Sequence, residues 1–143
     1  MSKSFIKVLG TAALLVGSSL LHAQQPEKTA SPSGAQAYIV SPANGATVGS
    51  TFTVVFGLKG MGVAPAGVQA NNTGHHHLLV DGVQMPDLNI PLGSNVSHFG
   101  GGQTETSLTL TPGQHTLQLI LGDHLHIPHN PAVVSEKITI TVQ

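Results

Sequence analysis

The chain has 143 residues, of which 40% are hydrophobic and only 8% are charged, and its formal net charge is −1. This composition excludes a fully disordered chain, and the length leaves room for one ordinary domain. Arginine is absent and the part after the first 23 residues is mildly acidic, which argues against a nucleic-acid partner. Cysteine is also absent, so disulfides, thiolate ligands and a lipidated cysteine are excluded, and any metal ligands are expected to be nitrogen and oxygen.

Residues 1–23 have the pattern of a signal peptide. Lys3 and Lys7 stand at the start, an apolar run follows, and Ala23 ends the segment. The apolar run is shorter than the roughly 20 residues that a membrane span needs. We therefore expect cleavage before Gln24, no stable membrane anchor after cleavage, and a periplasmic or secreted protein.

The next segment, residues 24–36, is rich in Pro, Ser, Gln and Thr and is expected to be a flexible linker. Residues 37–143 contain short apolar stretches of period two, separated by Gly, Pro, Asn and Asp. This pattern predicts an all-β domain, an immunoglobulin-like antiparallel β-sandwich of about seven strands. The predicted strands are residues 37–41, 51–58, 76–81, 87–90, 104–110, 115–121 and 135–142.

Alternation along these strands predicts which side chains face the core. The positions expected to point inward are Phe52, Val54, Phe56, Leu58, Leu108, Leu110, Leu117, Leu119, Leu121, Ile138, Ile140 and Val142. Two connections, residues 59–74 and 91–103, are longer than a minimal sandwich requires. Long ordered loops usually carry function.

Seven histidines fall into three groups along the predicted domain. They are His75, His76 and His77, then His98 alone, then His124, His126 and His129. In a sandwich of this kind, the loops after the second, fourth and sixth strands emerge at one end. The three groups occupy those connections, so we expect them to share that end, whereas His115 opens a strand at the opposite end and is left out.

Clustered imidazoles suit divalent transition metals, and the sequence leaves copper and zinc open as the cofactor. Because alternate residues of a strand face the same way, His75 and His77 could bind together, as could His124 and His126, while His76 would face the other side. Asp123 and Glu105 are the nearby carboxylates, available as ligands or as hydrogen-bond partners of the histidines. Met61 is a possible soft ligand for Cu(I).

Two other interpretations of the same residues stay open. The histidines could form a structural polar network in a metal-free structural or interaction domain. They could also belong to an enzyme in which a metal activates water or the imidazoles act as acid and base. The sequence contains no serine elbow motif and few charged residues, so it gives no sign of nucleophilic or carboxylate-pair catalysis.

The motifs GHHHLLVDG (residues 74–82), HFGGGQTE (98–105) and PGQHTLQLILGDHLHIPHNP (112–131) resemble a bacterial domain-of-unknown-function family of small exported proteins, from about Tyr38 onward. That resemblance implies a compact all-β exported domain that carries these histidines, and it implies no established activity. The segment SPANGATV (41–48) is more remotely similar to periplasmic immunoglobulin-like copper-resistance proteins. Since the expected mature terminus is Gln24, an N-terminal histidine ligand is not available.

Overall fold

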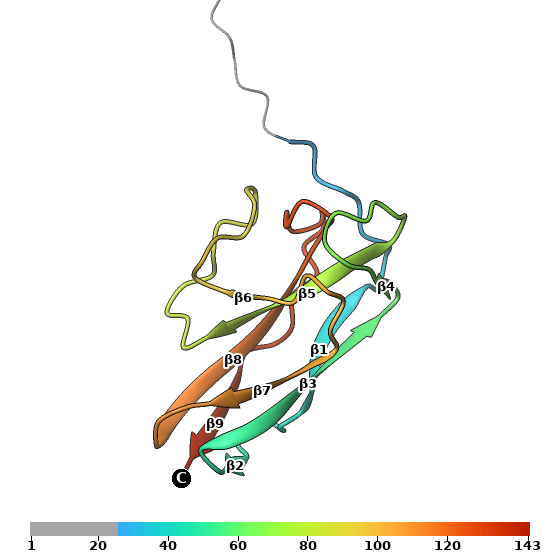
Figure 1. Ribbon diagram of the computed structural model, residues 1–143. Coiled ribbons are helices and arrows are strands. Elements are labelled where there is room, and N and C mark those ends of the chain that lie inside the picture. Colours follow the sequence, from blue (N-terminus) through green and yellow to red (C-terminus); the bar gives the residue numbers. More distant parts are fainter. Residues whose placement is uncertain (1–25) are drawn as a thin grey trace, which may run out of the picture.

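Two β-sheets face each other in the computed structural model, which describes residues 26–143 (Figure 1). The strands are β1 (Gln36–Ser41), β2 (Thr47–Val48), β3 (Thr51–Lys59), β4 (Gly62–Val63), β5 (Thr73–Val80), β6 (Ser97–His98), β7 (Glu105–Thr109), β8 (Gly113–Gly122) and β9 (Ile138–Val142). The predicted signal peptide, residues 1–23, lies outside the described residues. Within residues 26–143, no helix is long and apolar enough to cross a membrane.

The strand order is that of an immunoglobulin-like sandwich. One sheet has the order β1-β3-β7, and the other has the order β2-β9-β8-β5-β4, with β6 paired to β5. Of the six longer strands, β1, β3 and β7 therefore lie in one sheet and β5, β8 and β9 in the other, which corresponds to strands A, B, E and C, F, G of the immunoglobulin fold. All pairings are antiparallel except those of the two-residue strands β2 and β4, which are parallel. The predicted fold class is confirmed.

The core lies between the sheets and contains the side chains that alternation predicts. Val54 and Phe56 of one sheet pack with alternating residues of β8 and β9 from the other. The buried members include Leu117, Leu119, Leu121, Ile140 and Val142, and the partly buried ones include Phe52, Leu58, Leu108, Leu110 and Ile138.

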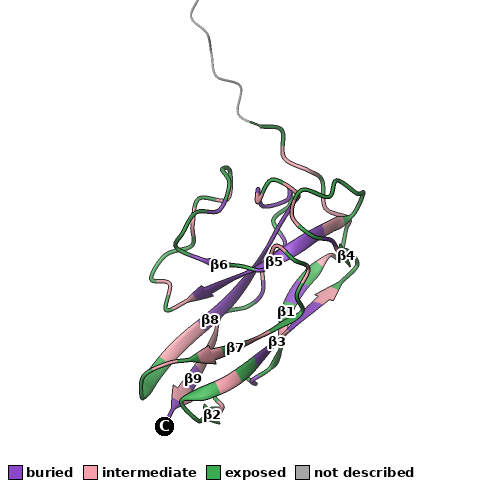
Figure 2. Cartoon of the chain, viewed as in Figure 1, coloured by how far each residue is buried: buried purple, intermediate pink, exposed green. Residues whose placement is uncertain are grey.

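Residues 74–79 of β5 and 117–122 of β8 are buried on both faces, and most of β5 and the upper part of β8 are purple in Figure 2. On the face away from the core, Leu79 of β5 and Ile120 of β8 pack against Leu92 and Val96. These two residues belong to the long connection between β5 and β6, so this connection covers the outer face of the sheet. Sheets that are covered on both sides contain near-continuous apolar runs, such as the LLV of β5 and the LILG of β8.

The prediction of a fourth strand at residues 87–90 is wrong. These residues form a turn, in which the Asp87 carboxylate accepts a hydrogen bond from the backbone N–H of Asn89 at 2.9 Å. Such a local side-chain bond competes with strand pairing. The strand that follows β5 in the chain is instead β6, and it pairs His98 with His77.

The expected flexible linker, residues 24–36, is described from residue 26, and part of it is fastened to the domain. Ala30 forms a parallel bridge with Asn130, whose N–H donates to the carbonyl of Thr29 at 2.9 Å. The segment has too few apolar residues for a core of its own, but backbone pairing with a loop needs none. We call residues 28–31 the N-terminal strap.

The packing gives a first prediction, for Leu119→Ala. Leu119 is fully buried in the core, so its truncation should lower the free energy of unfolding by about 2–5 kcal/mol. Urea unfolding of the metal-free protein measures this loss. Val83→Ala is the matched control, because Val83 is 94% exposed and its truncation should change stability by less than about 0.5 kcal/mol. A loss for Leu119→Ala no larger than for the control would contradict the assignment of the core.

Candidate metal centre

Three consecutive histidines on β5 occupy both faces of one strand. His75, His76 and His77 are all fully buried. The ring of His76 lies 5.2 Å from that of Phe56 in the core, between centroids, whereas His75 and His77 lie on the opposite face with their ring centroids 4.6 Å apart. The prediction that His75 and His77 share a face and His76 does not is confirmed, because strand side chains alternate.

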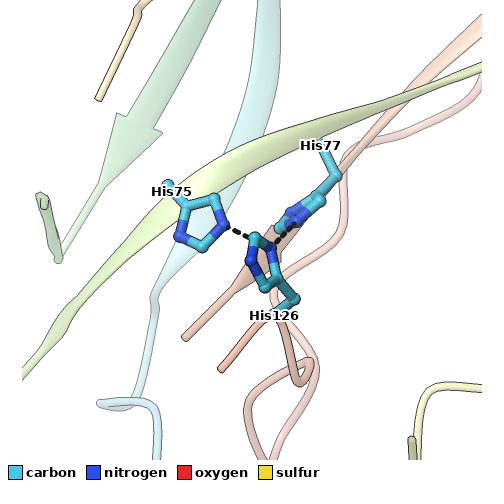
Figure 3. A group of neighbouring side chains, drawn as sticks. All are labelled: His75, His77 and His126. Atoms are coloured by element: carbon cyan, nitrogen blue, oxygen red, sulfur yellow. Dashed lines mark hydrogen bonds between the residues drawn. The ribbon is translucent and has the colours of Figure 1, made fainter. Parts of the chain in front are cut away.

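The third member of the cluster comes from the loop after β8. His126 Nδ1 lies 2.9 Å from His75 Nε2 and 3.2 Å from His77 Nε2 (Figure 3). One nitrogen of each of these three residues lies within 4.8 Å of the other two. His126 adopts a φ of 64°, in the left-handed region that non-glycine residues rarely occupy. Backbone strain of this kind often occurs where a side chain must be held in a functional position.

His98 approaches the same point from β6. Its Nδ1 lies 3.2 Å from His126 Nδ1, and its ring centroid is 4.7 Å from that of His77. On its other side, His98 Nε2 donates a hydrogen bond to the carbonyl of Gly93 at 2.9 Å. Because a carbonyl accepts only, the neutral ring must carry its proton on Nε2. The lone pair of Nδ1 therefore faces the cluster, the arrangement that a second partner of a metal-bound histidine usually enforces.

Hydrogen bonds alone do not account for this cluster. A ring nitrogen has a single in-plane lone pair or a single N–H, and so it makes one good hydrogen bond. His126 Nδ1 nevertheless has three nitrogen neighbours, at 2.9, 3.2 and 3.2 Å. A cation placed among the nitrogens of His75, His77 and His126, which all lie within 4.8 Å of one another, would accept their lone pairs at once.

Burial keeps these imidazoles neutral. Desolvation, together with the neighbouring histidines, lowers the pKa of His75 to about 4 and that of His77 to about 3. The pKa of His126 is also lowered, first by burial and then by His98. Neutral rings keep the lone pairs that bind a metal ion.

The structure does not bring His76 or His129 into this cluster. His76 faces the core, where neither of its ring nitrogens has a hydrogen-bond partner and burial lowers its pKa to about 4. His129 is also buried, and its Nε2 donates to the carbonyl of Thr73 at 3.1 Å. These two histidines therefore lie away from the convergent nitrogens.

Asp123 and His124 also lie outside the cluster. The Asp123 carboxylate accepts hydrogen bonds from the N–H groups of Leu125 and Ile127, at 2.9 and 3.0 Å. The expectation that His124 and His126 bind together on a strand end is wrong, because residues 124–125 form a turn and not a strand. Alternation applies only to extended chain, and the turn separates the directions of the two side chains.

The other candidates lie elsewhere. His115 is at the opposite end of the sandwich, as expected, where its Nδ1 lies 2.7 Å from an Asp81 carboxylate oxygen that raises its pKa. Glu105 is exposed on β7, and Met61 packs against the core. Gly93 holds the ring of His98 through its backbone carbonyl. Every residue has such a carbonyl, so sequence spacing alone could not single out Gly93.

Comparisons with known proteins define the family but not the activity. Residues 54–143 match the family described as "Domain of unknown function (DUF4399)", and the chain belongs to this family. No curated protein matches the chain. Among solved structures, the chain is similar to the fibronectin(III)-like modules of Clostridium thermocellum CbhA, at 12% identity and a TM-score of 0.35, over 75% of this chain and 93% of that one. The remote resemblance to copper-resistance proteins stays a hypothesis.

The lowered pKa values predict a loss of stability in acid for the metal-free protein. Above about pH 6.5 the three histidines of β5 are neutral in both the folded and the unfolded state. Below it the unfolded chain takes up protons that the folded protein refuses, until the pH reaches the folded pKa values of about 3 to 4. The free energy of unfolding should therefore fall steadily from pH 6.5 towards pH 4.

Urea unfolding in the presence of a chelator, at several pH values from 7.5 to 4.5, measures this dependence. His76→Leu is the matched variant, because it removes one of the three buried imidazoles and lies outside the cluster. It should make the dependence on pH less steep, because one fewer buried imidazole resists protonation in the folded protein. Stability that stays constant between pH 6.5 and 5 would show that these rings are not held neutral.

Proposed function

We propose that this protein is exported and binds one divalent transition-metal ion, copper or zinc, through His75, His77 and His126, with His98 as the fourth ligand. The observation that carries the proposal is the convergence of imidazole nitrogens from three separate segments of chain, with those of His75, His77 and His126 within 4.8 Å of one another and His98 Nδ1 3.2 Å from His126 Nδ1. All-nitrogen sets of this size suit copper and zinc better than magnesium or calcium, which prefer oxygen.

The spacing of the nitrogens supports a shared ion. Four ligands at a zinc–nitrogen distance of about 2.0–2.1 Å in a tetrahedron lie about 3.3 Å from one another. The nitrogens of His75, His77 and His98 lie 2.9 to 3.2 Å from His126 Nδ1, close to that value. The nitrogens of His75, His77 and His126 all lie within 4.8 Å of one another, which is close enough for one ion to contact all three.

Accessibility also supports a binding role. His75 and His77 are buried, His126 is half-buried and His98 is exposed, so the cluster reaches the surface on one side. An ion can therefore arrive from solvent on the side of His98, while the strand β5 holds the two inner ligands.

Metal titration of the protein, purified without a histidine tag, tests the proposal. We expect one Cu(II) or Zn(II) ion per chain and a rise in melting temperature on binding. The double variant His77→Ala/His126→Ala should lose stoichiometric binding, because two of the four ligands are gone. His115→Ala is the matched control and should bind like the parent, since His115 lies at the other end of the sandwich.

The alternative hypothesis, a metal-free structural or interaction domain, predicts no metal binding. If the parent shows no stoichiometric binding and the double variant melts far lower without metal, the histidines form a structural network and the metal proposal is wrong.

Export has a separate test. The charged start, the apolar run and Ala23 predict that the mature protein from the native host begins at Gln24 or within a few residues of it. N-terminal sequencing or intact mass of the soluble protein measures this. Soluble protein that keeps Met1 would contradict export with cleavage.

A further inference from the structure

The N-terminal strap lies along the loop that carries His126. Asn130 donates to the carbonyl of Thr29, and its own carbonyl accepts from the N–H of Ser31, at 2.9 and 3.2 Å. Figure 1 shows the strap, in blue, entering at the end of the sandwich where the orange-red loop after β8 lies. A segment nearly a hundred residues away in sequence therefore flanks the candidate metal centre.

Asp123 joins the strap to His126. One carboxylate oxygen accepts the Thr29 hydroxyl at 3.1 Å. The other accepts the N–H groups of Leu125 and Ile127, the two neighbours of His126 in the chain. Asp123 is only 2% exposed, so these hydrogen bonds are shielded from solvent. Hydrogen bonds to a shielded carboxylate are among the stronger ones in proteins.

The loop needs this support because its backbone is strained. The left-handed φ of His126 is costly for a residue with a Cβ, by about 1 kcal/mol or more. The bonds of Asp123 to the flanking amides hold the turn in this conformation. Without them the turn would relax, and His126 Nδ1 would leave the position that faces His75 and His77.

The strap also reaches the segment that leads to His98. Lys28 Nζ donates to the carbonyl of Leu88 at 2.7 Å, in the connection between β5 and β6. In the same connection, Leu92 donates to the carbonyl of His126 at 2.9 Å, and the Gly93 carbonyl holds the ring of His98. The strap thus contacts the loop that carries His126 and the connection that leads to His98 on β6, whereas His75 and His77 lie on β5.

We infer that the N-terminal strap is a latch of the metal centre, in which Thr29 acts as a positioning residue through Asp123. Docking of the strap holds His126, and with it the four-nitrogen arrangement, so metal affinity is high when the strap is docked and low when it is released. Because the coupling between two binding equilibria is reciprocal, a bound ion must in turn favour docking of the strap. This inference rests on the proposed function.

Substitutions at Thr29 test the positioning role without changing any charge. Thr29→Val removes the hydroxyl and should weaken Zn(II) affinity by about tenfold, at the low end for a residue behind a metal ligand. Thr29→Ser keeps the hydroxyl and should bind like the parent. Thr51→Val is the control for loss of a threonine hydroxyl, because the Thr51 hydroxyl bonds only the Thr109 side chain, in the sheet that does not carry the histidines.

Trypsin provides a direct measure of docking. The chain has no arginine, and its lysines within the described residues are Lys28, Lys59 and Lys137, so cleavage after Lys28 reports opening of the strap. Zn(II) should slow this cleavage in the parent several-fold more than it slows cleavage after Lys137. The protection should be much weaker in Thr29→Val and intact in Thr29→Ser.

The outcomes separate the latch from the metal site itself. If the parent binds Zn(II) but Thr29→Val binds equally well and Zn(II) does not protect Lys28, the latch is wrong and the metal site stands. If the parent binds neither Zn(II) nor Cu(II), the proposed function fails, and so does the linkage. Docking of the strap through Asp123 is then tested by trypsin cleavage after Lys28 in the metal-free protein. Faster cleavage of Thr29→Val than of the parent would support docking. Equal rates would overturn it.

Discussion

The pairing of β5 with β8 in a sheet that is covered on both faces is the constraint on which the rest of the structure depends. It aligns His75, His76 and His77 with Gly122, Leu121 and Ile120. Since side chains alternate, this register places two imidazoles under the outer connection and one against the core. A shift of one residue would exchange them. Gly122 is the residue that permits this packing, because a Cβ there would lie 2.5 Å from His77 Cε1.

Burying imidazoles in this way is costly for the protein without metal. Desolvation removes the protonated state that each ring would otherwise reach in mild acid, and several ring nitrogens of β5 have no hydrogen-bond partner. An ion bound at the Nε2 atoms of His75 and His77 would offset part of the desolvation cost through metal–nitrogen bonds, but it would leave their Nδ1 atoms without a partner. It would offset none of this cost for His76, whose ring packs beside Phe56 and belongs to the core.

The cluster combines rigid and adjustable parts. β5 holds two nitrogens on a central strand, where backbone movement would disturb the core. His98 and His126 come from connections that rest on a few hydrogen bonds, to Gly93 and to Asp123. In the proposed metal centre, His75 and His77 would stay in place on β5, and the strap would support the loop that carries His126.

The sequence by itself determined the all-β class, the inward-facing residues of the long strands, the opposite orientations of His75 and His76, and the end of the sandwich where the histidine groups meet. Each follows from period-two alternation and from the order of strands. Only the tertiary structure decided that His126 and not His124 joins the cluster, that residues 87–90 form a turn, and that the strap is docked. These features depend on hydrogen bonds between segments far apart in the chain, such as Thr29 to Asp123, and no local pattern encodes them.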